Sequence, residues 1–315
     1  MIDRSDTEPG GPFGHPALFY RDDGECLRGT VPFVRAGLEA GEPVAVAVPG
    51  PRLDAVRACL GAAAAEVEWI DMAVAGRNPG RIIPGVLCAF ADRHRTARVR
   101  IIGEPVWAGR TPVEYPACVQ HEALINLAFA NRRAAVLCPY DVSALDARVI
   151  ADACATHPTV IDRDGERRSP HYAPRTALER YNRPLPAPPP GTAPEEFRYD
   201  IGSLPRLREF AYTRGAALGL DDRRAGDLEL AINELGANSI VHAGGKGVLR
   251  IWPEDGHVVG EVRDDGRFTD PLAGRLPAGL STDGGRGLLM VNHLADLVRL
   301  HTTPEGTAIR VYMRL

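Results

Sequence analysis

The sequence has a single lysine, Lys246, and its other basic side chains are arginines. A phosphate loop of the form Gly-x-x-x-x-Gly-Lys requires a lysine that follows a glycine-rich turn. No such loop can exist in the first half of the chain. Nucleotide binding through that motif is therefore excluded there.

Cys-x-x-Cys pairs are also missing, and all six cysteines lie in the first half of the chain. This pattern favours reduced, mostly buried thiols. Two Cys-x-x-His pairs, Cys118 with His121 and Cys154 with His157, could together hold a tetrahedral zinc ion. However, the first pair falls inside a predicted amphipathic helix, and His157 precedes a proline where the chain turns. We interpret the two pairs as a coincidence of spacing.

The chain has neither a long apolar run nor a long basic run, and its net charge at pH 7 is only −4. No run is long enough to span a bilayer, so we expect no membrane association. The lack of a basic run argues against nucleic acid as a direct partner. Residues 1–14 do not have the basic start and apolar stretch of a signal peptide, so we expect a cytoplasmic protein.

Proline is abundant in one place, the stretch from Arg183 to Pro194, which is typical of a semi-rigid polyproline linker. A chain of 315 residues is long enough for two domains with separate cores. We therefore predict a first domain at 14–182, a linker at 183–195 and a second domain at 196–315.

In the first domain, short apolar runs alternate with helical patterns. The run 43–48 is almost continuously apolar, as expected of a buried parallel strand. The other predicted strands are 67–70, 99–102 and 134–138, and the predicted helices are 25–40, 52–64, 79–94 and 115–131. Such alternation predicts a doubly wound α/β domain.

Ligands of doubly wound sheets bind beyond the carboxyl ends of the strands. Aromatic and polar residues at those positions could line a small-molecule pocket. The candidates are His15, Tyr20, Glu104, Trp107, Tyr140 and Asp141. The same residues could equally be loop residues with packing roles, and the sequence leaves both readings open.

Five motifs of this domain also resemble one family. They are His15-Pro-Ala-Leu-Phe-Tyr20, Gly37-Leu-x-x-Gly-Glu-Pro43, Gly103-Glu-Pro-Val-Trp107, Glu122-Ala-Leu-Ile-Asn126 and Leu137-Cys-Pro-Tyr-Asp141. Together they resemble the MEDS sensory domain, named for methanogen and methylotroph regulators. The resemblance implies a RecA-like α/β fold without a working phosphate loop, which senses a small organic molecule.

The second domain is predicted to be an α+β layer. Its predicted elements are an edge strand at 197–200, a helix capped by Ser203 and running to about 218, a helix at 227–242, a hairpin of strands 247–252 and 258–263, a short helix from 284 to 294, and closing strands at 297–302 and 307–314.

The helix at 227–242 carries Glu234 and Asn238 one turn apart, so both side chains lie on the same face. A carboxylate and an amide there suit Mg²⁺, which prefers oxygen ligands. Taken alone, the pair is more typical of an ordinary solvated helix face.

Two further motifs favour a metal and nucleotide site at this pair. Asp264-x-Gly266 follows a strand directly, where the aspartate can accept a hydrogen bond from an exocyclic amine such as that of adenine. Gly284-Gly-Arg-Gly-Leu288 is a glycine-rich turn that enters a helix, where backbone N–H groups can face phosphate oxygens. Glu234 could then act as a general base or orient an attacking group, with Asn238 on the metal.

The three motifs in this order resemble the Bergerat, or GHKL, ATPase fold that is shared by gyrase, Hsp90, MutL and histidine kinases (HATPase_c). The resemblance implies ATP with Mg²⁺ as cofactors, Glu234 as the catalytic residue and Asn238 as the metal ligand. The implied nucleotide-binding residues are Asp264, Gly266, Gly285, Arg286, Gly287 and Thr307.

The compact second domain and its ending Gly306-Thr-x-x-Arg310 look most like the anti-sigma-factor serine kinases of the RsbW and SpoIIAB type. This resemblance implies a sigma factor as partner and phosphorylation of a serine on a STAS-type anti-anti-sigma factor. Kinases of this type are commonly dimers, which adds a homodimer to the expectations.

One residue departs from the family pattern, because Phe268 stands where the first glycine box usually has its second glycine. The adenine contact should survive this change, whereas closure of the loop 267–283 over the nucleotide is in question. Two alternatives to the kinase therefore stay open. One is a non-catalytic sigma-binding switch that holds ATP only as a structural ligand. The other is a protein like the sensor histidine kinases, although no helical-hairpin segment precedes Phe197.

Overall fold

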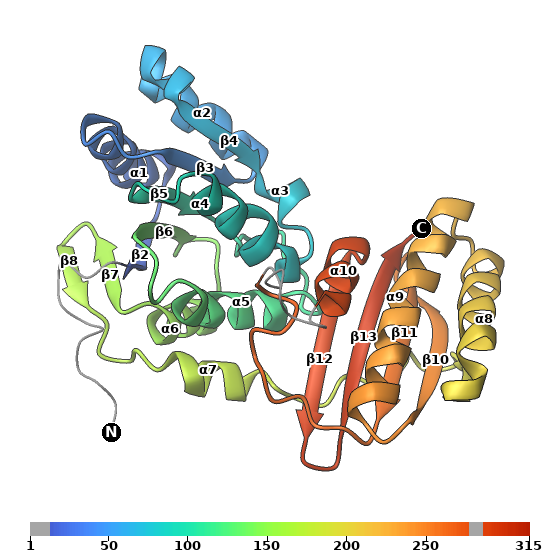
Figure 1. The fold of residues 1–315 in the computed structure, drawn as a ribbon. Coiled ribbons are helices and arrows are strands. Elements are labelled where there is room, and N and C mark those ends of the chain that lie inside the picture. The colour runs from blue at the N-terminus through green and yellow to red at the C-terminus, as the bar shows by residue number, and fades with distance from the viewer. Residues whose placement is uncertain (1–12, 277–285) are drawn as a thin grey trace. The chain divides into compact units, whose positions relative to one another are not determined.

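The computed structural model describes residues 13–276 and 286–315 and divides into two compact units, with the division between Tyr181 and Asn182 (Figure 1). The expected two-domain α/β architecture is confirmed, with a mixed sheet in the first unit. Among the described residues, no helix is both long and apolar enough to cross a membrane.

The first unit is built on an eight-stranded sheet with the order β4-β3-β5-β6-β2-β7-β8, and β1 pairs with β6. Every pairing is parallel except that of β8 with β7. The strands are β1 (Phe13–Gly14), β2 (Pro16–Tyr20), β3 (Val44–Val48), β4 (Val67–Asp71), β5 (Val99–Gly103), β6 (Ala134–Asp141), β7 (Thr159–Asp162) and β8 (Gly165–Arg168).

Helices cover both faces of this sheet, which explains why β3 is apolar at every position. One face packs on α1 (Asp23–Glu39) and α2 (Gly50–Leu60) through residues such as Val46 and Leu137. Because side chains alternate along a strand, Cys138 and Tyr140 point to the other face. That face meets α5 (Tyr115–Ala128), on which α6 (Ala147–Thr156) and α7 (Pro174–Arg180) pack.

The predicted helix over 79–94 is wrong as a single element. The chain instead forms a 3-10 turn, η3 (Pro79–Arg81), a π-helical turn, η4 (Ile83–Cys88), and the short helix α4 (Ala89–Arg93). Pro79 and Pro84 have no N–H to donate, so a regular hydrogen-bond ladder cannot run through both. Two further short elements, η2 (Gly61–Glu66) and α3 (Met72–Ala75), flank β4.

The second unit is an antiparallel sheet with the order β12-β13-β11-β10-β9, covered on one face by helices (Figure 1). Its elements are β9 (Glu195–Asp200), η5 (Ile201–Ser203), α8 (Leu204–Ala217), α9 (Asp222–His242), β10 (Lys246–Glu254), β11 (His257–Asp264), α10 (Gly287–Leu294), β12 (Leu297–Thr303) and β13 (Gly306–Arg314). The core lies between helices and sheet, where Leu228, Ile232 and Leu235 of α9 are fully buried.

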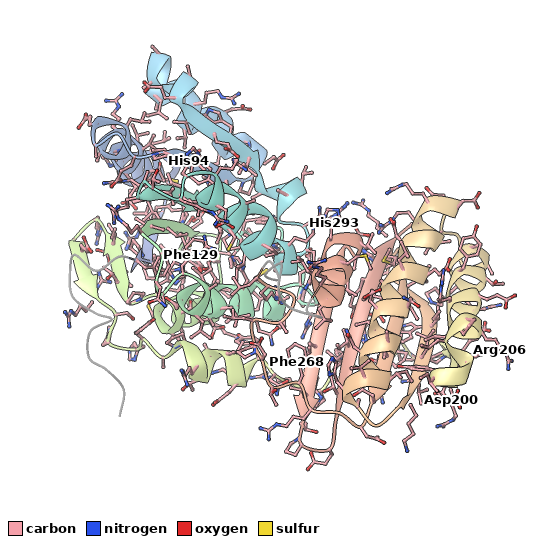
Figure 2. All side chains as sticks on the ribbon, viewed as in Figure 1. His94, Phe129, Asp200, Arg206, Phe268 and His293 are labelled. Carbon is pink, nitrogen blue, oxygen red and sulfur yellow. The ribbon has the colours of Figure 1, made fainter. Side chains whose placement is uncertain are left out.

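Local chemistry sets the boundaries of these elements. Asp255 and Gly256 both have positive φ, as a two-residue hairpin turn between β10 and β11 requires. The predicted cap at Ser203 is wrong in detail, because its side chain makes no cap hydrogen bond to α8. Asp200, labelled in Figure 2, instead accepts from the Ser203 N–H and forms a capping box on the preceding 3-10 turn.

Candidate functional site

A cavity of about 400 Å³ opens in the second unit between α9, the end of β11 and the start of α10. We call it the α9 cavity. Its volume falls in the range of small-molecule sites. Its lining residues are Leu235, Asn238, His242, Ala243, Val262, Asp264, Gly266, Arg267, Phe268, Thr269, Asp270, Ala273, Gly274, Gly287, Leu288, Thr307 and Ile309.

Asp264, the last residue of β11, is held in place by two hydrogen bonds. The Ser239 hydroxyl donates to Oδ2 at 2.6 Å, and the Gly266 N–H donates to Oδ1 at 2.9 Å. Each carboxylate oxygen can accept more than one hydrogen bond. Asp264 is therefore fixed in the cavity wall and can still accept a hydrogen bond from a ligand.

Gly266 and Thr307 form the adjoining part of the wall. The Thr307 hydroxyl donates to the Gly266 carbonyl at 2.7 Å and lies 2.8 Å from the Thr302 hydroxyl. A Cβ on Gly266 would come within 2.5 Å of the Ala243 Cβ, so only glycine fits without a shift.

Asn238 lines the cavity, and Glu234 lies one turn earlier on α9, beside the start of α10. A Cβ on Gly287 would meet the Glu234 Oε2 at 2.6 Å, which shows how closely the carboxylate approaches that backbone. The Asn233 side chain donates to the Glu234 Oε1 at 3.3 Å. The unpaired N–H groups of a helix start favour negative charge at this place.

The glycine-rich turn is described only in part. Gly285 lies outside the described residues, whereas Arg286 is exposed and precedes α10 as its N-cap. Gly287 lines the cavity.

Phe268 also lines the cavity, from the loop that follows β11 (Figure 2). Its N–H donates to the Thr302 hydroxyl at 3.0 Å, so this part of the loop is tied to β12. The aromatic ring therefore occupies the wall where the family pattern would place a bare glycine.

The residues around the cavity fit ATP with Mg²⁺. Asp264 offers an acceptor for an amine, Gly266 and Gly287 leave backbone accessible, and the oxygens of Asn238 and Glu234 suit a hard cation. Magnesium bound there would neutralise phosphate charge.

In the first unit, the six predicted pocket residues separate into two groups and one outlier. Tyr20 and Glu104 lie with Arg52 of α2 at the carboxyl ends of β2 and β5. Arg52 pairs with the Glu104 carboxylate and stands 5.0 Å from the centre of the Tyr20 ring. Glu104 is only 2% exposed, and its burial raises the pKa of this carboxyl to about 7 despite the arginine.

Asp141 belongs to the same region, because its charge adds to the raised pKa of Glu104. Its side chain accepts from the N–H and hydroxyl of Ser143, so it also shapes the turn after β6. Trp107 is the outlier. Its indole stacks with the Arg110 guanidinium at 3.8 Å, a contact within its own loop.

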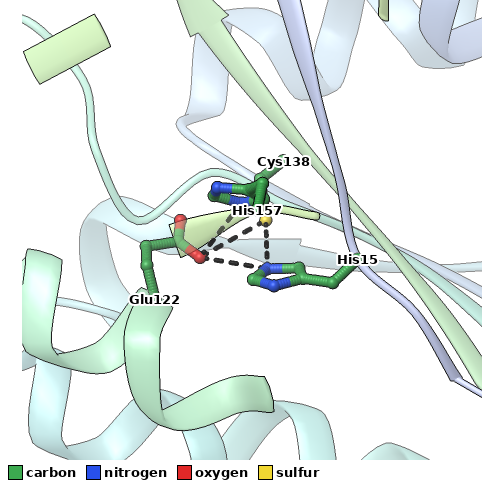
Figure 3. A group of neighbouring side chains, drawn as sticks. All are labelled: His15, Glu122, Cys138 and His157. Carbon is green, nitrogen blue, oxygen red and sulfur yellow. Dashed lines mark hydrogen bonds and ion pairs between the residues drawn. The ribbon is translucent and has the colours of Figure 1, made fainter. Parts of the chain in front are cut away.

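His15 and Tyr140 belong to a second group around Glu122 of α5, together with Cys138 and His157 (Figure 3). The Tyr140 hydroxyl donates to the Glu122 Oε1 at 2.9 Å. The neighbouring cavity has a volume of about 10 Å³, room for one water at most. His15 and Tyr140 are therefore buried network residues, and Tyr140 lines this small cavity.

Arg52 and Glu122 are the functional candidates that the sequence reasoning missed. Arg52 lies in the first turn of α2, four residues after the end of β3, where strand-end placement could have indicated a ligand contact. Glu122 is a buried acidic residue on a helix whose buried positions are mostly apolar, which indicates a buried partner.

The two Cys-x-x-His pairs do not come together. Among residues 13–276 and 286–315, the metal-competent group of His, Cys and acidic side chains includes His157 but not Cys118, His121 or Cys154.

Comparisons with known proteins agree with this division of the chain. Residues 14–158 match the MEDS family, described as the methanogen/methylotroph, DcmR sensory domain. Residues 197–313 match the histidine kinase-like ATPase domain. No curated protein matches the chain.

Two solved structures are similar to part of it. One contains the RsbU and RsbW domains of Rv1364c from Mycobacterium tuberculosis, with 23% identity and a TM-score of 0.31, over 39% of this chain and 33% of that one. The chain thus spans about a third of that protein's length. The other is the Acinetobacter baumannii histidine kinase AdeS, with 13% identity and a TM-score of 0.24, over 38% of this chain and 67% of that one.

Proposed function

Because the chain has a MEDS domain at its N-terminus and a histidine kinase-like ATPase domain at its C-terminus, we propose that it is an ATP-binding anti-sigma regulatory factor. In this proposal it phosphorylates a serine of a STAS-type anti-anti-sigma partner, and a small molecule on the first domain controls that activity. The first domain has the RecA-like fold and the second the Bergerat fold. Its partners are a sigma factor, the anti-anti-sigma factor and a second copy of the chain.

The α9 cavity is the observation that carries the proposal. It joins residues from three separate motifs, represented by Asn238, Asp264 and Gly287, in one space. A domain of this family implies ATP binding, and the cavity offers the groups that such a ligand needs. Nucleotide is thus the ligand whose chemistry best matches the wall.

We assign each residue of the wall one task. Asp264 holds the adenine amine, Asn238 contributes an oxygen to the magnesium, and Gly287 with Arg286 faces the phosphates. Glu234 accepts the proton of the attacking serine hydroxyl or orients that hydroxyl. Thr307 keeps Gly266 in position under the base.

The sensory site of the first domain is proposed at Arg52, Glu104 and Tyr20. One Glu104 oxygen and the Tyr20 hydroxyl are buried without a hydrogen-bond partner, so a small polar ligand could satisfy both. Their place at the strand ends is the usual ligand position in such sheets.

Phosphoryl transfer is the test. The full-length protein, incubated with Mg-ATP and its cognate STAS-type partner, should label a serine of that partner. Glu234→Ala should remove the labelling and keep nucleotide binding. Glu229→Ala is the matched control, because Glu229 lies on the same helix, is outside the cavity and pairs with Arg208.

A non-catalytic switch is the second candidate, and Phe268 in the cavity wall favours it. ATP binding without any labelled product would select the switch and reject the kinase. An acid-labile phosphohistidine on the isolated chain would instead select the histidine kinase-like alternative. Loss of nucleotide binding altogether would reject all three.

A further inference from the structure

The first domain holds a cluster of four buried side chains, His15, Glu122, Cys138 and His157, each at most 1% exposed. Figure 3 shows them converging from different parts of the fold. His15 precedes β2, Cys138 lies in β6, Glu122 belongs to α5, and His157 follows α6. One potential ligand atom from each lies within 4.8 Å of the others.

Four of the six distances between these atoms are close to the edges of a metal-centred tetrahedron, and the other two are at most 4.8 Å. The Glu122 Oε2 is 3.2 Å from the His15 Nε2, 3.5 Å from the His157 Nε2 and 3.6 Å from the Cys138 Sγ. The Cys138 Sγ is 3.4 Å from the His15 Nε2. Four such ligands around Zn²⁺, at ordinary bond lengths, lie about 3.3–3.8 Å apart.

Hydrogen bonds outside the cluster turn the lone pair of each imidazole inward. The His157 Nδ1 lies 2.9 Å from the Ala153 carbonyl, which can only accept, so Nδ1 carries the proton. The His15 Nδ1 lies 3.2 Å from the Asn126 Oδ1. The Asn126 amide nitrogen donates to the Thr156 carbonyl, which leaves its oxygen to accept from His15.

Both Nε2 atoms therefore carry a lone pair and no hydrogen, and they face the Glu122 Oε2, which can also only accept a hydrogen bond. The His157 Nε2 has no hydrogen-bond partner although it is fully buried. The Cys138 thiol can donate a single hydrogen bond, to the Glu122 Oε2, so the contacts between Oε2 and the two nitrogens would be satisfied by a cation bound between them. Outward Nδ1–H bonds of this kind are the usual support of metal-ligating histidines.

Charge supports the same conclusion. A carboxylate and a thiolate supply two negative charges, and two neutral imidazoles supply none. A divalent cation would make the buried site neutral, and charge is tolerated in a protein interior only when it is compensated.

We propose that His15, Glu122, Cys138 and His157 bind a divalent transition metal of the zinc class in a closed, four-coordinate site. Two nitrogens, one sulfur and one carboxylate oxygen are a donor set typical of Zn²⁺ and Co²⁺. The four ligands leave no open position, so the metal joins β2, β6, α5 and α6 and does not take part in a reaction. Binding displaces the Cys138 thiol proton to solvent.

The test uses the full-length chain without nucleotide. After chelation and dialysis, the protein should take up one equivalent of Zn²⁺ or Co²⁺. The Co²⁺ form should show the strong visible absorption of a tetrahedral site and a thiolate-to-cobalt band. X-ray absorption of the Zn²⁺ form should give one sulfur and three light-atom neighbours.

Two variants separate this site from other cysteines. Cys138→Ser should abolish the thiolate-to-cobalt band and weaken Zn²⁺ binding at least about a hundredfold. Cys154→Ser should leave both unchanged, because Cys154 lies outside the cluster. If Cys138→Ser does not fold, the number of sulfur neighbours of zinc in the wild-type protein, measured by X-ray absorption, still tests the proposal. No metal uptake, or a spectrum with two sulfurs or none, would overturn the proposal.

Discussion

At the scale of single residues, burial decides what each candidate side chain does. Glu42 and Glu104 are both paired with arginines, yet their pKa values move in opposite directions. For Glu104 burial outweighs Arg52, so its pKa is raised. For Glu42 burial also acts upward, but hydrogen bonds from Arg100 and Arg98 outweigh it and lower the pKa.

This difference predicts a pH dependence for Glu104→Gln. Between the ordinary pKa of 4.5 and the raised value of about 7, the folded protein binds a proton that the unfolded chain has lost. The free energy of unfolding of the wild type therefore falls as pH rises through this window, by up to about 3 kcal/mol. In Glu104→Gln this fall should disappear, so the variant should gain stability relative to the wild type from pH 5 to pH 7, measured by scanning calorimetry.

The matched control is Glu42→Gln. Its carboxylate has a lowered pKa, so the stability it contributes is present above 4.5 and is lost only as pH falls further. Its difference from the wild type should stay constant between pH 5 and pH 7. An equal pH slope in the wild type and Glu104→Gln would mean that Glu104 ionises normally in the folded protein.

In the second domain, the residues that line the cavity were easier to predict from the sequence than the side chains that hydrogen-bond to them. The motif Asp264-x-Gly266 predicted a contact to adenine, and the family resemblance added Thr307; the structure brings all three residues to one cavity. The hydroxyl of Ser239, which holds Asp264, was not predicted. It comes from a different element, and no local pattern encodes a contact between distant segments.

At the scale of elements, the face of the second sheet that points away from its helices has a polar centre. Arg310 of β13 is fully buried, and its guanidinium donates to the Glu261 carboxylate of β11 at 2.5 and 2.9 Å. It also stacks near Trp252 and donates to the carbonyl of Pro186 in the proline-rich segment. Arg310 thus joins two strands and that segment.

Breaking this pair should be costly. Glu261→Leu leaves a buried guanidinium without a counter-charge, so we expect about 3–5 kcal/mol of destabilisation. The double variant Glu261→Leu with Arg310→Met removes both charges and should be less destabilised than either single variant. Urea unfolding of the four proteins of this double-mutant cycle measures the coupling. Additive effects of the two substitutions would mean that the pair has no net interaction.

Several elements with strong periodic or apolar patterns were predicted, whereas the apolar strand β2 and the amphipathic helix α6 were missed. The apolar run at β3 and the amphipathic pattern of α9 both correspond to observed elements. Strand β8 was not predicted, because its sequence Gly-Glu-Arg-Arg is exposed at every position and pairs only at the sheet edge. The interruption at η4 depends on Pro84 and on packing, which periodicity alone does not express.

At the scale of the whole molecule, two units with separate cores carry separate sites. One core lies between α8, α9, α10 and the second sheet, and others lie within the first unit. Within residues 13–276 and 286–315, those that line the α9 cavity belong to the second unit, and the four-residue cluster belongs to the first. The linker composition favoured two domains, whereas the convergence of four distant side chains on one point could not be predicted from their spacing in the sequence.

Separate cores predict two thermal transitions that respond to different ligands. Mg-ADP at a hundred times its Kd should stabilise the second domain by about 2.7 kcal/mol, because it binds only the folded state. For a domain of this size, that corresponds to an upward shift of about 10 °C in one transition. The other transition should stay in place, and scanning calorimetry of the full chain can resolve both.

Asp264→Asn supplies the control for this experiment. The asparagine amide group is a hydrogen-bond donor where the carboxylate oxygen was an acceptor. Nucleotide should therefore no longer raise the midpoint of the second domain's transition. Asp265→Asn should keep the shift, because that exposed side chain pairs with Lys246 and lies outside the cavity. A single transition in the wild type that shifts with nucleotide would instead mean that the two domains unfold as one cooperative unit, so that a ligand on either domain stabilises the other.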